Sequence, residues 1–178
     1  MKDKVLNFWF SELTSKDWFT KDESLDLKIS HLFLETYQKA VRGELFKWRE
    51  NIEGRLAEVI VLDQFSRNIF RDKAESFQYD CMALTLAQEA SSLDEALDLS
   101  PMMRGFLYMP YMHSESLLIH EEAVKLFSQK GLEHNLEFEI KHKKIIEKFG
   151  RYPHRNKILG RESTPEEIEF LKRPGSSF

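Results

Sequence analysis

The sequence contains few of the residues that hold small exported proteins together. One cysteine in 178 residues excludes any disulfide within the chain. A chain of this length can bury about two thirds of its unfolded surface and needs no cross-link to be stable. We therefore expect one domain over residues 1–178 in a reducing compartment, the cytoplasm, with Cys81 packed as a small residue of the core.

Long apolar runs are also absent. The longest stretch, residues 56–65, is interrupted by Glu58 and Asp63 and is far shorter than the ~20 residues that span a bilayer. The apolar run near the N-terminus is too short for a signal peptide. We therefore expect a soluble protein that does not enter a membrane.

No strong excess of positive charge is present. Lys and Arg number 26 against 30 Asp and Glu, a formal net charge of -4, so we do not expect a nucleic-acid binder. The charge is nevertheless uneven, because residues 141–161 contain eight basic residues and one acidic residue. An anionic ligand, RNA or the acidic helices of the protein itself are the alternatives for the partner of this segment.

Glycine and proline are scarce, with 7 and 5 residues, and strand patterns are nearly absent. The spacing of apolar residues and the capping signals predict an all-α fold of antiparallel helix pairs joined by short loops. Pro110 is expected to break one helix, Ser114 to cap the next, and Thr164 to open the last with a capping box. The expected helices lie at about 22–42, 51–68, 76–90, 102–109, 114–130, from after 131 to 149, and 164–172.

Two charged residues fall on the apolar face of the second expected helix. Asp63 and Arg67 share that face with Leu56, Val59 and Ile60, and their i, i+4 spacing lets them pair. A buried charge needs such a partner. The pair is either a lock between two helices, which is the commoner use, or part of a functional site.

Three histidines and one glutamate also fall on the apolar faces of expected helices. In the helix expected after Pro110, His113, His120 and Glu121 point inward. His113 and His120 lie roughly 10 Å apart along the axis, too far to grip one ion, so we predict no metal site and no cofactor. His142 lies on the stripe of the following helix and is the easiest group to recruit for proton transfer.

Residues 150–156 form the most unusual loop, in which basic and amide side chains flank Pro153. Arginine forks bind carboxylate or phosphate with two hydrogen bonds. The same donors can cap helices or pair with Asp63 or Glu121, so both uses stay open. Together with two arginines of earlier helices, the candidate anion-binding residues are Arg67, Arg104, Arg151, His154, Arg155 and Asn156.

Three long motifs, at residues 62–71, 106–115 and 149–156, closely resemble the bacterial family catalogued as domain of unknown function 924. Further likeness at residues 5–10, 159–161, 163–167 and 174–178 extends over nearly the whole chain. The resemblance implies an all-helical fold similar to tetratricopeptide-repeat proteins, and no established activity. The family pattern has glutamine where this chain has His120, which favours Glu121 over His120 as a catalytic candidate.

Two functions of different classes follow. In the first, which we favour, the basic groups hold a small anionic ligand while Asp63, His113, Glu121 or His142 transfers protons. In the second, a tetratricopeptide-like scaffold binds a protein partner, and the inward polar cluster is purely structural. No nucleophile elbow or phosphate loop is present, so the sequence leaves open whether the protein is an enzyme, and also its oligomeric state.

Overall fold

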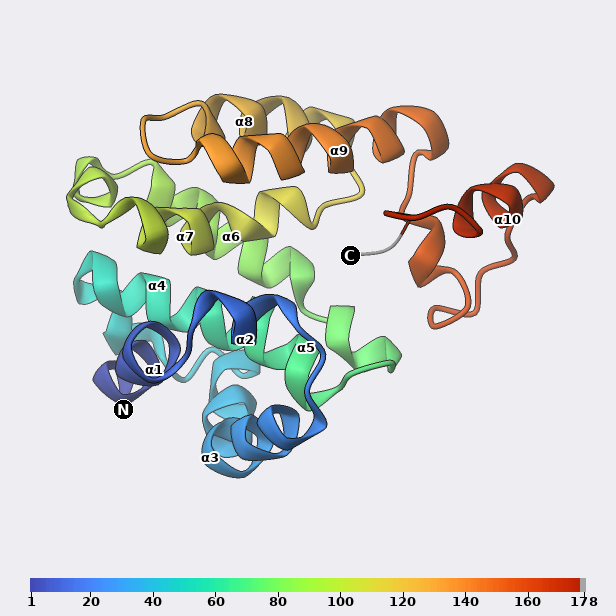
Figure 1. The fold of residues 1–178 in the computed structure, drawn as a ribbon. Coiled ribbons are helices and arrows are strands. Elements are labelled where there is room, and N and C mark those ends of the chain that lie inside the picture. The colour runs from blue at the N-terminus through green and yellow to red at the C-terminus, as the bar shows by residue number, and fades with distance from the viewer. Residues whose placement is uncertain (177–178) are drawn as a thin grey trace.

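The computed structural model describes residues 1–176, so the last two residues of the 174–178 motif lie outside the described chain. Within that range every regular element is helical, which confirms the predicted all-α class (Figure 1). The helices are α1 (Lys2–Asn7), α2 (Ser15–Phe19), α3 (Glu23–Val41), α4 (Ile52–Ile60), α5 (Ser66–Ile69), α6 (Asp80–Ser91), α7 (Pro101–Met112), α8 (Leu117–Phe127), α9 (Glu133–Phe149) and α10 (Pro165–Leu171).

The layers follow the order of the chain. Figure 1 shows α1 to α5 at one side, α6 and α7 in the middle and α8 and α9 at the other side. Large apolar side chains fill the space between these layers, among them Trp9, Phe33, Phe65, Tyr108 and Phe127. Phe33 and Phe65 stack with ring centroids 4.6 Å apart, which joins α3 to the segment between α4 and α5.

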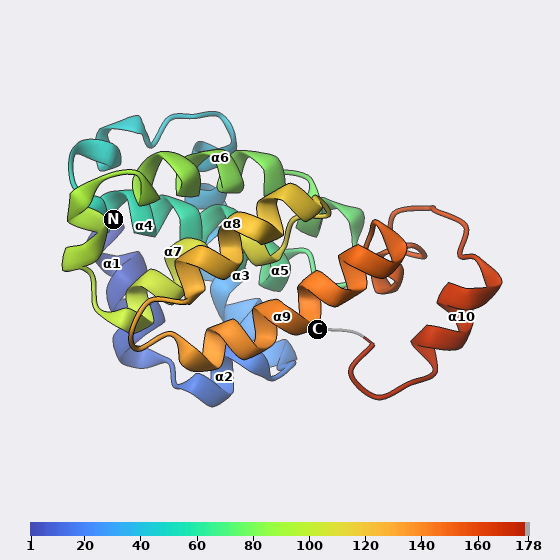
Figure 2. The same cartoon turned by 90° about the horizontal axis from the view of Figure 1, so that it is seen from above.

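The C-terminal segment forms a separate small contact. Both views show α10 projecting beyond the end of α9 (Figures 1 and 2). Tyr152 packs with Ile145 and Ile146 of α9, while Phe170 of α10 packs on Phe149. Because Tyr152 is fully buried, its ring is one of the contacts that tie the segment after α9 to the rest of the protein.

The helix expected at 51–68 is present but not uniform. Asn51 caps α4 through its side chain, which accepts a hydrogen bond from Gly54 N–H. Residues Val61–Phe65 then form a π-helical turn before α5 continues in the same direction. Such turns insert one extra residue and often occur at functional sites, and this one contains Asp63.

Some local predictions were wrong. α7 continues through Pro110 to Met112, because residues 105–112 are all buried and their packing outweighs the lost backbone hydrogen bond. The N-cap position of the next helix is Ser116 rather than Ser114, and the Ser116 side chain makes no capping hydrogen bond. Cys81 is exposed, because the face of α6 that meets the core consists of Ala83, Ala87 and Ala90.

The predicted capping box at the last helix is confirmed. Thr164 N–H donates to Glu167 Oε2 over 2.7 Å, and Glu167 N–H donates to Thr164 Oγ1 over 3.2 Å. No helix in residues 1–176 is both long and apolar enough to cross a membrane.

Candidate functional site

Asp63 is the deepest charged group of the site. It lies in the π-helical turn, and its side chain is 1 % exposed. Its Oδ1 accepts a hydrogen bond from His113 Nδ1 at 2.7 Å and lies 3.2 Å from Arg67 Nη1. Burial alone would raise the pKa of Asp63, but Arg67 and the hydrogen bonds from His113 and Gln64 hold it below its usual range. The predicted Asp63–Arg67 ion pair is therefore confirmed.

His113 follows the last residue of α7 and is 17 % exposed. Because Asp63 is ionised, Nδ1 carries the proton of this hydrogen bond. Burial and the charge of Arg67 lower the pKa of His113, although Asp63 opposes them, so the ring is neutral at pH 7. Its Nε2 makes no hydrogen bond with residues 1–176 and is not enclosed. His113 Nε2 is therefore a proton acceptor whose direction is fixed by the hydrogen bond between Nδ1 and Asp63.

Arg67 joins Asp63 to a second carboxylate that the sequence analysis missed. Its guanidinium donates to both carboxylate oxygens of Asp80, over 3.1 and 2.9 Å, and also to the Asp63 carbonyl over 2.7 Å. Asp80 is the first residue of α6. The only sequence signal for it was an acidic residue near the start of an expected helix, which is common at helix N-termini.

Arg155 is the last member of the series of neighbouring charged residues that begins at Asp63. It lies in the short helical turn Pro153–Arg155, is 7 % exposed, and places Nη1 3.6 Å from Asp80 Oδ2. Its guanidinium carbon lies 4.7 Å from the ring centroid of Phe77 and 4.6 Å from that of Tyr152. Its side chain makes no hydrogen bond with the described residues, and its Nε is enclosed without a partner. We call Asp63, Arg67, Asp80, His113 and Arg155 the polar cluster.

Three more histidines surround Tyr152 beside this cluster. Their ring centroids lie 5.5 to 6.3 Å from the Tyr152 ring, whose hydroxyl donates to the Met112 carbonyl over 2.6 Å. Burial is the main cause that lowers the pKa of two of them, to about 3 for His142 and about 4 for His154. The inward position predicted for His142 is confirmed, and both rings are neutral at pH 7.

The inward position predicted for Glu121 was wrong. Glu121 is exposed, because α8 begins at Leu117 and turns His120, Ala123 and Phe127 toward the core. The acidic partner is Glu139 of α9, whose Oε1 lies 2.6 Å from His120 Nδ1, with both side chains fully enclosed. Burial raises the pKa of Glu139 against the hydrogen bond from His120.

Arg151 and Asn156 hold the C-terminal segment together. Arg151 donates to both carboxylate oxygens of Glu167, over 2.7 and 2.8 Å, and Asn156 donates to Ser163 and Glu167. The segment is fixed to the bundle by Glu115, which accepts two hydrogen bonds from Arg161, over 2.6 and 2.9 Å, and one from Tyr152 N–H over 2.8 Å. These donors are already used within the protein.

Arg104 lies away from the other candidates. It donates to the carbonyls of Leu97 and Lys130, and it lies about 13 Å from His113 along the axis of α7. Of the six candidate anion-binding residues, the structure brings Arg67, His154 and Arg155 to the polar cluster. It places Arg104 elsewhere and engages Arg151 and Asn156 with neighbouring residues.

Acidic pH should weaken the Arg151–Glu167 ion pair and so destabilise the C-terminal segment. The hydrogen bond from Arg151 is the main cause that holds the pKa of Glu167 at about 2, below its ordinary value of 4.5. Because the folded pKa is depressed, the stabilisation is present above pH 4.5 and is lost as pH falls toward 2. We expect the protection factors of amides in residues 151–171, which are exchange rates corrected for the intrinsic rate at each pH, to fall in that window. Glu167→Gln should remove most of this pH dependence; unchanged protection factors between pH 5 and 2.5 in the unaltered protein would contradict the assignment.

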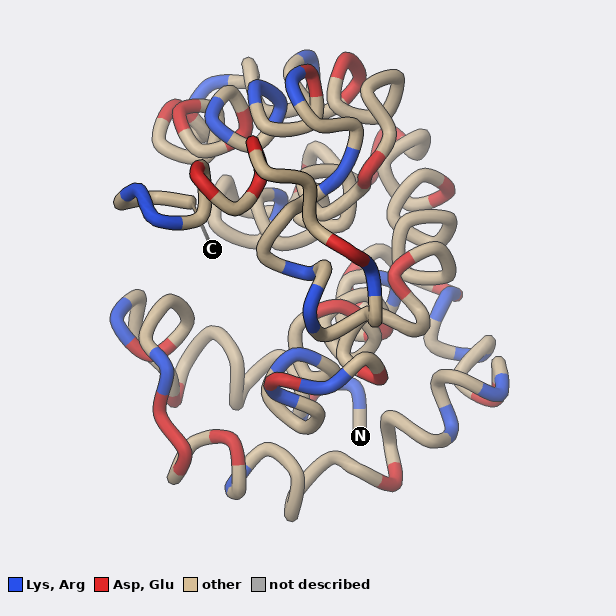
Figure 3. The backbone as a smooth tube through the Cα atoms, turned by 90° about the vertical axis from the view of Figure 1, so that its right-hand side faces the viewer, with Lys and Arg blue, Asp and Glu red and all other residues tan. Residues whose placement is uncertain are grey.

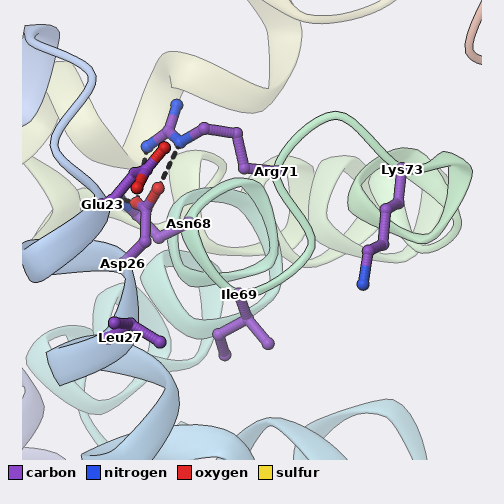
Figure 4. Close-up of a pocket in the computed structure, with 7 residues that line it drawn as sticks. All are labelled: Glu23, Asp26, Leu27, Asn68, Ile69, Arg71 and Lys73. Atoms are coloured by element: carbon purple, nitrogen blue, oxygen red, sulfur yellow. Dashed lines mark hydrogen bonds and ion pairs between the residues drawn. The ribbon is translucent and has the colours of Figure 1, made fainter.

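Charged residues outside the cluster are mixed in sign, as Figure 3 shows along the backbone. Two shallow hollows also lie away from it. One, of about 280 Å³, is bordered by α3 and α5, where Arg71 pairs with Asp26 (Figure 4). The other, of about 410 Å³, lies beside Arg151 and Thr164. In residues 1–176 no group of three or more His, Cys, Asp or Glu could hold a metal ion.

Comparison with known proteins supports the resemblance predicted from the sequence. A family model described as bacterial protein of unknown function (DUF924) matches residues 5–175. The chain is similar to the solved structure of a protein of unknown function, ATU0120 from Agrobacterium tumefaciens, with 36 % identity over 96 % of each chain and a TM-score of 0.91. No curated protein matches.

Proposed function

Since the chain belongs to the DUF924 family of bacterial proteins, which carries no assigned function, we propose from its geometry that it binds a small anionic ligand at the polar cluster. The observation that supports this most strongly is Arg155. Its guanidinium is nearly enclosed and yet makes no hydrogen bond with residues 1–176. An anion would supply the acceptors that this side chain lacks.

The proposal rests on the free-energy cost of burying an arginine whose donors have no hydrogen-bond acceptor. A buried donor without an acceptor costs about 1–3 kcal/mol, and more when it is charged. Arg151 and Arg161 do not show this defect, since each donates two hydrogen bonds to a carboxylate. Arg104 also has an enclosed Nε without a partner, but its Nη1 and Nη2 donate to two carbonyls, whereas no nitrogen of the Arg155 guanidinium donates to a described residue. Arg155 instead approaches Asp80 only at 3.6 Å, and Asp80 is already bound by Arg67.

His113 gives the proposed site a group for proton transfer. Its Nδ1 is fixed by Asp63, and its accessible Nε2 is free to accept a proton. Asp63 orients the ring and stabilises the imidazolium, as a carboxylate does beside a catalytic histidine. Ligand binding by Arg155 and proton acceptance by His113 are therefore the two roles that we assign.

A titration with small anions followed by NMR tests the proposal. Acetate, phosphate and sulfate should be added separately, up to tens of millimolar, in a buffer without other small anions. We expect at least one of them to shift the amide signals of His113, His154 and Arg155 with saturation, while those around Arg104 stay fixed. Equal, unsaturated shifts at Arg104 and Arg155, or none at either, would refute it.

The alternative is a tetratricopeptide-like interaction scaffold, with α6 to α9 stacked as successive antiparallel hairpins. It is supported by exposed apolar side chains on the outer helices, such as Leu118 of α8 and Ile140 of α9, which are 68 % and 41 % exposed. In that case the polar cluster is a lock. The NMR titration separates the two, because a lock has no specific anion site.

A further inference from the structure

The charges of the polar cluster balance within the protein. Asp63 and Asp80 contribute two negative charges, and Arg67 and Arg155 contribute two positive ones. The neighbouring rings of His113, His142 and His154 are neutral at pH 7. A ligand with two negative charges would therefore enter a site with no net positive charge, at a high desolvation cost.

The edge of Arg155 that makes no hydrogen bond with the described residues has the geometry that binds a planar anion. Phe77 and Tyr152 lie against the guanidinium, and Nη1 faces Asp80, so Nε and Nη2 form the edge that remains. That edge is the fork that holds a carboxylate through two parallel hydrogen bonds in one plane. A carboxylate is flat like the guanidinium, so both of its oxygens can lie in that plane, whereas a tetrahedral phosphate also has oxygens outside it.

We infer that the ligand of this site is a carboxylate with a single negative charge, and that one proton is taken up by His113 when it binds. The inference rests on the proposed anion site. A single negative charge added to a neutral cluster favours the gain of one positive charge nearby. His113 is the histidine best placed to gain it, since its Nδ1 already donates to Asp63 and its Nε2 is accessible.

The charged and titratable side chains that face His113 come from each of the segments packed against it. Asp63 and Asp80 favour its charged form and Arg67 opposes it, while the rings of His142 and His154 compete for the same proton. Burial is the main cause that lowers the pKa of all three rings, and at His113 the charge and hydrogen bond of Asp63 oppose it. The bound anion thus raises the pKa of His113 from its depressed value.

The pH dependence of affinity follows from this linkage. Carboxylate affinity should fall as pH rises through the bound-state pKa of His113, by up to about tenfold per pH unit. Calorimetric titration of acetate at pH 6.5 in two buffers with different ionisation enthalpies should show uptake of close to one proton. His113→Asn, which keeps a donor toward Asp63, should bind acetate with little dependence on pH and no proton uptake.

Sulfate, which is tetrahedral and keeps two negative charges at pH 6.5, separates the two proposals in the same titration. Acetate binding with proton uptake, and weaker sulfate binding, is the expected result. Tighter binding of sulfate, or acetate binding without proton uptake in the unaltered protein, would overturn the inference and leave the anion site standing. Absence of binding by both anions at pH 6 would overturn the anion site as well.

Discussion

Replacing Asp63 with alanine is expected to lower the free energy of unfolding by about 3–5 kcal/mol. The carboxylate is fully enclosed, and its removal leaves His113 Nδ1 without an acceptor and Arg67 with one carboxylate instead of two. A buried charge that loses its partner is among the most destabilising of single changes. Urea unfolding of both proteins, followed by far-ultraviolet circular dichroism, measures the difference.

A matched surface pair provides the control for this prediction. Glu35 and Lys39 form an i, i+4 ion pair on α3 in which both side chains are well exposed. Glu35→Ala should leave stability nearly unchanged, because water replaces the lost partner. Equal effects of Glu35→Ala and Asp63→Ala would mean that the polar cluster is solvated and that its burial has no energetic consequence.

Replacing Arg155 with methionine is expected to separate ligand binding from stability. The methionine keeps an apolar stem near Phe77 and Tyr152, and no hydrogen bond to a described residue is lost. Asp80 keeps both hydrogen bonds from Arg67. We therefore expect the free energy of unfolding to stay within about 1 kcal/mol or to rise, as when other buried charges are replaced by apolar residues.

Acetate binding should respond in the opposite way. Loss of two charge-assisted hydrogen bonds, each worth about 1.5–3 kcal/mol, predicts at least about 100-fold weaker binding. Arg161→Met is the contrasting variant, because Arg161 donates two hydrogen bonds to Glu115 and should be needed for stability. A large loss of stability in Arg155→Met, with no change in binding, would identify Arg155 as a structural lock.

Helical periodicity predicted the all-α class and the Asp63–Arg67 pair because both depend on spacing within one segment. It failed for Glu121 because His113 was assigned to the same helix as His120. In the structure the two belong to different helices, α7 and α8, so the face extrapolated from His113 was rotated away from the true one. Because a helix turns by about 100° per residue, the face extrapolated from His113 still contained His120, which is buried as predicted, but it wrongly contained Glu121 as well.

The partners of the loop after α9 could not be predicted from spacing. Arg151 and Arg155 are four residues apart in one motif, yet Arg151 binds Glu167 and Arg155 faces Asp80. These partners lie 16 and 75 residues away in the sequence, so the tertiary packing of the segment decides which arginine meets which carboxylate. Glu115 and Glu139 were missed for the same reason, since their partners come from other segments.

A crystal structure of the protein grown with acetate near pH 6 tests the central claim most directly. We predict an ordered acetate whose two oxygens accept hydrogen bonds from Nε and Nη2 of Arg155, with Asp63 still bound to His113. A water molecule that links Arg155 Nε to a protein oxygen, with no anion beside the guanidinium, would contradict the claim. Arg155 would then be satisfied within the protein, and the polar cluster would be part of its architecture.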